Sequence, residues 1–384
     1  MNRPATLPLL VVVLSLFVAC DVAPRTLGSG AVPRFFGSAR EADGDVALRT
    51  PKRAGHPVVL VTLDGARWQE LFLGTDEKRT KPGEPHESPA ALFPNVYRAL
   101  AGSGCALGAP GHGVVAASGP NFVSLPGYTE IFTGRAPVAC GDNDCARTTI
   151  PTILDQAHAM GLSVAAHGSW ERLERAATKY PGTFPASFGR GTAAGDPYPG
   201  TGEFRPDRDT AAKALRVLED DRPDLLYVGL GEPDEYAHRG DYAGYVGSLR
   251  RSDAFLGDLF AALGRMGERG AATHVIVTAD HGRADDFVNH GGGSPESARV
   301  FLLAFGPEVS RRGFVHSRTP RKLGDVAPTL ATLLGFGPDG PESKEAREGD
   351  VVAELFDRAE VYATSARRDV ASLPRRERLN VSGR

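Results

Sequence analysis

Five apolar runs recur along the chain, and each is followed by residues that favour loops. They cover residues 57–65, 163–168, 224–234, 273–282 and 299–306, and most are rich in valine, leucine or isoleucine. Runs of this length without alternating polar positions predict short strands that are buried on both faces.

Segments with helical spacing lie between these runs. The clearest cover residues 150–161, 209–222 and 324–335, and the last of them reaches Gly335, a typical helix stop. Strands that alternate with helices favour a parallel sheet that is covered on both faces. The predicted fold is therefore α/β, a three-layer α/β/α sandwich with a mostly parallel central sheet.

The first twenty residues have a different character. One arginine precedes an apolar run of about a dozen residues, which has the length of a secretory signal and is too short to span a bilayer. The run ends at Ala19 and Cys20 and resembles a bacterial lipoprotein signal, in which Cys20 becomes the lipidated first residue. Ordinary cleavage and full secretion is the alternative, because Phe17 stands where leucine is usual. We expect export to the periplasm or cell envelope, with the lipid on Cys20 as the membrane anchor.

Composition and charge divide the rest of the chain. Residues 21–52 are rich in glycine, proline, arginine, alanine and aspartate without periodicity, which predicts a flexible tether. Residues 53–360 would form one large domain, and residues 361–384 a loose C-terminal tail. The net charge of −3 and the absence of a basic run give no sign of a nucleic-acid-binding surface.

Three further cysteines, Cys105, Cys140 and Cys145, would meet an oxidising compartment in an exported protein. We expect one disulfide and one remaining thiol. Cys140 and Cys145 could close a small loop, and Cys105 could pair with either of them. The spacing of the three matches no thiolate metal motif.

A single serine stands out in the segment NFVSLPGYTEIFTGR, residues 121–135. Ser124 lies just before a Pro-Gly step at the start of a predicted helix, where backbone N–H groups have no intrahelical partner and favour an anion. Ser124 is therefore either a nucleophile or an ordinary helix cap.

Carboxylates and imidazoles follow three of the predicted strands. In chain order they are Asp64 after the first strand, Asp234 and His238 after the third, and Asp280, His281 and His290 after the fourth. The carboxyl ends of parallel strands share one edge of a sheet, and ligands bind there. One helical turn would place Asp234 and His238 on the same side. If the regular strand ends here, as Gly282 permits, Asp280 and His281 could both face one site.

This set of side chains predicts a metal centre. Mixed aspartate and histidine ligands favour Zn²⁺, with Mn²⁺ or iron as weaker alternatives. Six ligands exceed the four that a tetrahedral ion takes, so we expect two ions. The positive charge of two dications exceeds the negative charge of three carboxylates, and the surplus would attract an anionic substrate. Such a pair can clamp the attacking and leaving oxygens of an in-line displacement, and an ion beside Ser124 would activate it.

The order of these motifs resembles the alkaline phosphatase superfamily, most closely its nucleotide pyrophosphatase/phosphodiesterase-like branch. SLPGYTEIFTG matches the nucleophile stretch without a gap, and LDG matches the first metal-binding aspartate. PDEYAH and TADHG match the two ligand pairs, and DVAPTLATLLG resembles the helix that closes the domain. The resemblance extends over residues 56–336 and implies that residues 53–360 are an alkaline phosphatase-like catalytic domain.

The resemblance also implies a role for each residue. One ion would be held by Asp64, Asp280, His281 and Ser124, and the other by Asp234, His238 and His290. Ser124 would attack phosphorus, and water would hydrolyse the resulting phosphoserine. Asn143, in the segment CGDNDC, would help to bind a phosphate oxygen.

Two departures from family patterns narrow the expected activity. Sulfatases carry an arginine four residues after the nucleophile, where this chain has Tyr128, so a formylglycine sulfatase is disfavoured. Phosphomonoesterases place an arginine near the nucleophile to hold two phosphate oxygens. Here Arg135 and Arg147 would serve only if loops brought them close.

The sequence therefore predicts a zinc-dependent hydrolase of phosphoric esters, a phosphodiesterase or phosphatase, that acts on a small-molecule ester or diester. One alternative is a phosphotransferase or mutase of the same superfamily. Another is a non-catalytic lipoprotein that binds phosphate or metal. Diester, monoester, pyrophosphate and phosphonate groups all fit the same pair of ions.

Overall fold

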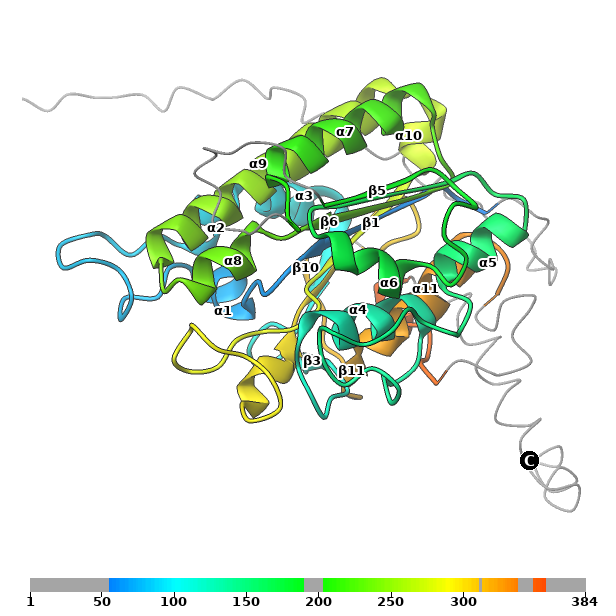
Figure 1. Ribbon diagram of the computed structural model, residues 1–384. Helices are drawn as coiled ribbons and strands as arrows, with labels where there is room; N and C mark the ends of the chain where they lie inside the picture. Colours follow the sequence, from blue (N-terminus) through cyan, green and yellow to red (C-terminus); the bar gives the residue numbers. More distant parts are fainter. Residues whose placement is uncertain (1–54, 190–202, 311–312, 338–347, 357–384) are drawn as a thin grey trace, which may run out of the picture. The chain divides into compact units, whose positions relative to one another are not determined.

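The computed structural model describes residues 55–189, 203–310, 313–337 and 348–356 (Figure 1). The predicted signal (1–20), tether (21–52) and tail (361–384), and with them Cys20, lie outside these residues. Within the described ranges, no helix has both the length and the apolar character needed to cross a membrane.

A mixed eight-stranded sheet forms the centre of the fold. Its order is β10 (Gly313–Phe314), β2 (Gly104–Leu107), β9 (Leu302–Phe305), β7 (His274–Thr278), β1 (Val58–Leu63), β6 (Leu225–Leu230), β4 (Val164–Gly168) and β5 (Ala186–Phe188). The strands from β7 to β5 run parallel, whereas β9 is antiparallel to β7 and β2. A second, three-stranded sheet contains β11 (Arg321–Lys322), β3 (Val115–Ala116) and β8 (Arg299–Val300).

All five predicted strands are present, although the fifth is divided. Residues 299–306 form β8 and β9, with Phe301 between them. β1, β6 and β7 are buried along their whole length, as unbroken apolar runs predict. The sequence analysis did not identify β2, β3, β5, β10 or β11. These strands have only two to four residues each, too few for a recognisable pattern.

Helices cover both faces of the sheet and complete the predicted α/β/α sandwich (Figure 1). One face carries α3 (Pro94–Ser103), α7 (Asp207–Asp220), α9 (Tyr242–Arg265) and α10 (Glu268–Ala272), and the other α4 (Ser124–Thr133), α5 (Ile153–Ala159), α6 (Glu174–Ala177) and α11 (Val326–Leu333). Shorter helices are α1 (Trp68–Leu73), α2 (Pro89–Leu92) and α8 (Glu232–His238). The three helices predicted by spacing correspond to α5, α7 and α11, and Gly335 after α11 has a φ of 85°, as expected of a helix stop.

One of the alternative cysteine pairings is observed. Cys140 and Cys145 form a disulfide that closes a short loop between α4 and α5. Cys105 is outside this disulfide and lies buried in β2.

Candidate metal centre

Three adjacent strands in the middle of the sheet, β7, β1 and β6, end at the same level. Thr62 of β1 pairs with Thr278 of β7, and Leu63 pairs with Leu230 of β6. Asp64 follows β1 directly, and its N–H donates to Leu230 O over 2.9 Å. The residues that follow these three strands therefore meet at one edge of the sheet, as the parallel arrangement predicts.

The chain bends immediately after β7. Asp280 and His281 come after the last strand residue, Thr278, and both are fully buried. Gly282 N donates to Ser297 O over 2.7 Å, and a Cβ atom on Gly282 would lie 2.5 Å from Arg299 O. Gly282 is thus needed for a close approach between two backbone segments rather than for a left-handed turn. The bend brings Asp280 and His281 into one cluster.

The first cluster contains Asp64, Asp280, His281 and Ser124. His281 Nε2 lies 3.5 Å from Asp64 Oδ1 and 3.3 Å from Asp280 Oδ2. Ser124 Oγ lies 3.2 Å from His281 Nε2 and 3.4 Å from Asp64 Oδ1. One ligand atom from each of Asp64, Asp280 and His281 falls within 4.8 Å of the other two. A single ion could contact all three.

Ser124 is the first residue of α4, and Val123 occupies the N-cap position. The N-cap side chain makes no capping hydrogen bond, because valine has no acceptor atom, and Ser124 Oγ is directed at Asp64 and His281. The amide of Leu125 is instead satisfied by Asn143 Oδ1 at 2.9 Å. The geometry disfavours the helix-cap interpretation of Ser124 and places the Asn143 side chain beside it. The role of Asn143 towards a phosphate stays a prediction.

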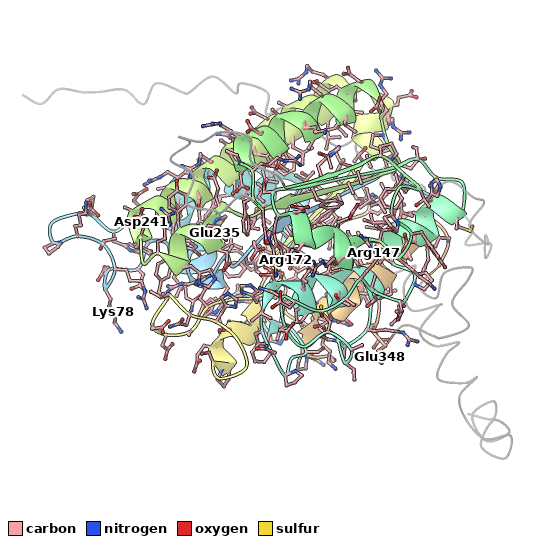
Figure 2. The ribbon with its side chains drawn as sticks, viewed as in Figure 1. Lys78, Arg147, Arg172, Glu235, Asp241 and Glu348 are labelled. Carbon is pink, nitrogen blue, oxygen red and sulfur yellow. A yellow bond between two sulfur atoms is a disulfide. The ribbon has the colours of Figure 1, made fainter. Side chains whose placement is uncertain are left out.

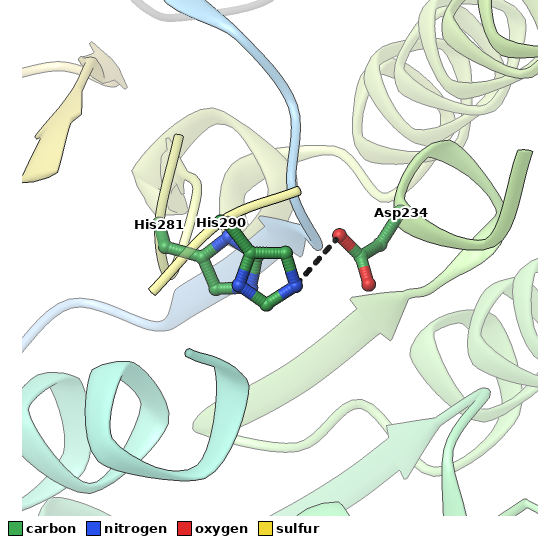
Figure 3. A group of neighbouring side chains, drawn as sticks. All are labelled: Asp234, His281 and His290. Carbon is green, nitrogen blue, oxygen red and sulfur yellow. Dashed lines mark ion pairs between the residues drawn. The ribbon is translucent and has the colours of Figure 1, made fainter. Parts of the chain in front are cut away.

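The second cluster contains Asp234, His238 and His290. Figure 3 shows Asp234 and His290 of this cluster together with His281 of the first cluster. Asp234 and His238 lie one turn apart on α8, as predicted, with His238 Nε2 at 3.0 Å from Asp234 Oδ2. His290 Nε2 lies 3.7 Å from Asp234 Oδ1 and 3.0 Å from His238 Nε2. The rings of His281 and His290 stack at 3.9 Å. Because His281 can join Asp234 and His290 as well as the first cluster, the two clusters adjoin.

The described side chains fit a pair of metal ions. Asp280 Oδ2 is buried and has no hydrogen-bond partner in the described part of the chain, so it has an unmet need for a donor or a cation. His281 Nδ1 lies 2.9 Å from Gly282 O, and His290 Nδ1 lies 3.0 Å from Phe122 O. When Nδ1–H donates to these carbonyls, each Nε2 presents a lone pair to the site, which is the usual arrangement of metal-binding histidines.

The electrostatics of the first cluster agree with this fit. Burial raises the pKa of Asp64 well above its usual value, and the neighbouring Asp280 and Asp234 raise it further. Burial and Asp234 raise the pKa of Asp280 in the same way. Burial also holds the pKa of His281 well below its usual value, so His281 supplies no balancing charge. A bound cation would stabilise the ionised carboxylates that burial disfavours.

Comparisons with known proteins agree with the fold and with the type of site. Residues 196–338 match the model of the Metalloenzyme superfamily, a range that holds Asp234, His238, Asp280, His281 and His290. A putative sulfatase from Bacteroides thetaiotaomicron superposes with a TM-score of 0.56 at 13% identity, over 79% of this chain and 75% of that chain. A 2-O GAG sulfatase gives a TM-score of 0.55 at 13% identity, over 79% of this chain and 74% of that chain. These two likenesses show the fold alone.

Residues 196–338 thus resemble the Metalloenzyme superfamily, and the fold of the chain is alkaline phosphatase-like. The match to a metalloenzyme family agrees with the cluster of aspartates and histidines at the carboxyl edge of the sheet and indicates the use of divalent metal. The nucleotide pyrophosphatase/phosphodiesterase-like branch stays a prediction.

Two curated relatives that match part of the chain are phosphoglycerate mutases. The chain is 31% identical to the 2,3-bisphosphoglycerate-independent phosphoglycerate mutase of Nitrosococcus oceani over 133 residues, which is 35% of this chain and 24% of that enzyme. It is 28% identical to the corresponding mutase of Ruegeria pomeroyi over 244 residues, which is 57% of this chain and 46% of that enzyme. The chain thus spans less than half of the length of these relatives. The family match and these relatives support metal-dependent chemistry of the phosphoryl-transfer kind.

Two residues that contact the predicted ligands were not identified from the sequence. Tyr128 OH donates to Asp64 Oδ2 over 3.0 Å. Arg283 is fully buried and donates to Asp234. Burial alone would raise the pKa of Asp234, but the Arg283 guanidinium holds it well below its usual range. Tyr128 could have been found from its spacing of four from Ser124, which places both on one side of the helix. Arg283 gave no comparable signal, because its partner lies 49 residues away.

The two arginines considered as phosphate ligands are not brought to Ser124. Arg147 (Figure 2) donates to Glu174 O, Thr178 O and Glu174 Oε2 over 2.8 to 2.9 Å, so its guanidinium holds a loop against α6. Arg135 follows the C-terminal end of α4, whereas Ser124 begins the helix. Neither arginine is therefore placed beside Ser124 by these contacts.

Proposed function

We propose that the chain is a zinc-dependent hydrolase of phosphoric esters in which Ser124 is the nucleophile. The position of Ser124 Oγ carries this proposal. The hydroxyl lies at the N-terminus of a ten-residue helix, beside the buried carboxylate of Asp64 and the imidazole of His281. Helix termini and cations both favour a serine alkoxide and a phosphate at this point.

Side chains of the protein would bind and orient the phosphate ester and supply the nucleophile. Ser124 Oγ would form a bond to phosphorus as the ester oxygen leaves, and water would then hydrolyse the phosphoserine. Asp64 Oδ1 and His281 Nε2 are within 3.4 Å of Oγ and would hold it in line with the leaving group. Asn143 already uses Oδ1 to accept from Leu125 N, so its amide nitrogen would donate to a phosphate oxygen.

The ions would be held as the resemblance implies. Asp64, Asp280, His281 and Ser124 would hold one, and Asp234, His238 and His290 the other. Bound dications would supply positive charge that favours the serine alkoxide and offsets the charge of the transition state. The mixture of imidazole and carboxylate ligands favours Zn²⁺ over Mn²⁺ or iron.

Replacement of the nucleophile tests the proposal. Ser124→Ala should lower turnover of an aryl phosphate by about a thousandfold or more, because no oxygen remains to attack phosphorus. The variant should still hold close to two zinc ions, since six other ligands remain. Ser88→Ala is a matched control, because Ser88 caps α2 away from the site. Full turnover in Ser124→Ala would end the proposal.

A paired assay addresses the substrate class. We expect an aryl phosphate diester to be hydrolysed faster than the corresponding monoester, because neither Arg135 nor Arg147 is placed to hold the extra charge of a monoester. Zinc content measured on the same samples separates a poor substrate from a site without metal. A preference for the monoester would make the chain a phosphatase rather than a phosphodiesterase.

Phosphoryl transfer to an acceptor other than water is a second candidate. It is favoured by the phosphoglycerate mutases among the curated relatives. Addition of an alcohol to the assay should then yield a transferred phosphate ester at the expense of inorganic phosphate. A zinc-loaded protein with no turnover on any of these substrates would instead be a non-catalytic binding lipoprotein.

We also propose that the protein is exported to the periplasm or cell envelope and anchored by a lipid on Cys20. The N-terminal sequence motivates this, and the Cys140–Cys145 disulfide agrees with an oxidising compartment. Cys20→Ser should move the protein from the membrane fraction to the soluble fraction of a bacterial host. Wild-type protein that stays soluble would refute the anchor.

A further inference from the structure

Arg283 lies in the loop after β7, and its side chain is fully buried. The guanidinium donates to Asp234 Oδ1 and to the backbone carbonyls of Phe287 and Val288. Gly65 packs directly over this pair, since a Cβ atom there would collide with Asp234 and come within 3.0 Å of Arg283 Nη1. Asp234 therefore has one oxygen committed to Arg283, and its Oδ2 faces His238.

Arg283 makes the charges of the two clusters unequal. The first cluster has two carboxylates, Asp64 and Asp280, and His281 Nε2 lies 3.5 Å from the first and 3.3 Å from the second. The second cluster has one carboxylate, Asp234, which is balanced by Arg283. Among the proposed ligands, one position thus has two carboxylates, whereas the single carboxylate of the other position is already paired with an arginine.

The histidines show the same asymmetry. His281 and His290 each have a backbone carbonyl behind Nδ1. His238 Nδ1 instead faces Arg283 Nη2 at 3.4 Å. A neutral His238 that offers Nε2 to a cation must carry its proton on Nδ1, and an arginine can only donate. Two donors would then face each other, which weakens His238 as a ligand.

We propose that Arg283 makes the two metal positions unequal, so that Asp64, Asp280 and His281 hold a tightly bound ion while Asp234, His238 and His290 hold an exchangeable one. Arg283 is a positioning residue that acts through Asp234 and His238. The inference rests on the two-ion site of the proposed function. It adds that a one-ion form accumulates at low free zinc and that turnover depends on the weaker position.

Stepwise loss of zinc tests the inference. Zinc-loaded full-length protein is dialysed against buffers of decreasing free Zn²⁺, and bound zinc is measured at each step. We expect wild-type protein to lose its ions in two steps, separated by about tenfold or more in free zinc. His290→Ala should remove the weaker step, and Asp280→Asn should disturb the tighter one.

Two variants of Arg283 separate its charge from its packing. Arg283→Gln keeps a donor but removes the charge, and we expect the two steps to move closer together by about tenfold. Arg283→Lys keeps the charge, and we expect the wild-type separation. Circular dichroism identifies a variant that fails to fold. Loss of both wild-type ions in one step, or the same separation in Gln and Lys variants, would overturn the inference.

The outcome is distinguishable from failure of the proposed function. Two separate zinc steps without hydrolysis of any phosphate ester would contradict the function and leave the unequal positions standing. Hydrolysis by a protein whose two ions leave together would support the proposed function and overturn the unequal positions.

Discussion

Tyr128 and Ser124 lie one turn apart on α4 and reach the same carboxylate. The tyrosine hydroxyl donates to Asp64 Oδ2, and the serine oxygen lies near Asp64 Oδ1. With Oδ2 held in this way, Oδ1 faces Ser124 and His281. Tyr128 occupies the place where a sulfatase would carry arginine. In this chain the residue at that position donates a hydrogen bond to Asp64, a proposed metal ligand.

Loss of this hydrogen bond should weaken the site without disturbing the core. We expect Tyr128→Phe to lower kcat/KM or zinc affinity by about tenfold or more, because partners of metal ligands have effects of that size. Steady-state kinetics and zinc dialysis measure the two effects. Tyr97→Phe is the control, since it removes a tyrosine hydrogen bond to Leu71 O away from the site. Equal activities in the two variants would show that Tyr128 has only a packing role.

At the scale of elements, the disulfide loop 140–145 is fixed against the start of α4. Arg172 (Figure 2) donates to Asn143 O over 3.2 Å and to Asp144 Oδ1 over 2.5 Å. Asn121 donates to Gly141 O over 2.6 Å. The loop therefore holds the Asn143 amide beside Ser124 before any substrate binds. A group that is already ordered costs less entropy to use.

Opening the disulfide should weaken substrate binding more than chemistry. We expect the Cys140→Ser/Cys145→Ser double variant to raise KM by about tenfold, because Asn143 would have to be ordered on binding. kcat at saturating substrate and zinc content should change little. Cys105→Ala serves as the matched loss of a thiol. A fall in kcat with unchanged KM would indicate that the loop supports the reaction itself.

At the scale of the whole molecule, buried histidines make stability depend on pH. His274 begins β7 at the edge of the sheet opposite the metal centre, and its ring is fully buried. Neither ring nitrogen has a hydrogen-bond partner within the described ranges, and Glu308 Oε2 is 3.9 Å away. Burial lowers the pKa of His274 to about 4. His167 on β4 is similar, with burial lowering its pKa to about 4.

The sign of the effect follows from the two pKa values of His274. Its folded-state pKa of about 4 lies below the ordinary value of 6.5, so the unfolded chain binds more protons between these values. The free energy of unfolding should therefore fall as the pH falls from 6.5 towards 4. At pH 5 His274 alone would account for about 2 kcal/mol. Above pH 6.5 its contribution should be constant.

Urea denaturation in the presence of a chelator, at pH 7 and pH 5, measures this loss without the contribution of bound ions. His274→Leu should lose less stability between the two pH values than wild type does. His158→Leu, at an exposed position on α5, should behave like wild type. An unchanged pH dependence in His274→Leu would show that other groups dominate.

Much of the fold could be predicted because its central strands are easy to recognise in the sequence. β1, β6 and β7 are buried on both faces, so their sequences are continuous apolar runs. The short edge strands could not be predicted. β10 and β11 have two residues each and depend on neighbours that are distant in sequence. The cysteine pairing stayed open for the same reason, since only the course of the loop selects Cys145 for Cys140.

The residue types at the strand ends are sufficient to predict which side chains cluster, because parallel strands bring their carboxyl ends to one edge whatever the details of packing. The partners of those ligands follow from long-range packing. Tyr128 reaches Asp64 across 64 residues, and Arg283 reaches Asp234 across 49. A hydrogen bond between residues so far apart leaves no local pattern. The relative strength of the two metal positions is therefore a property of the folded chain.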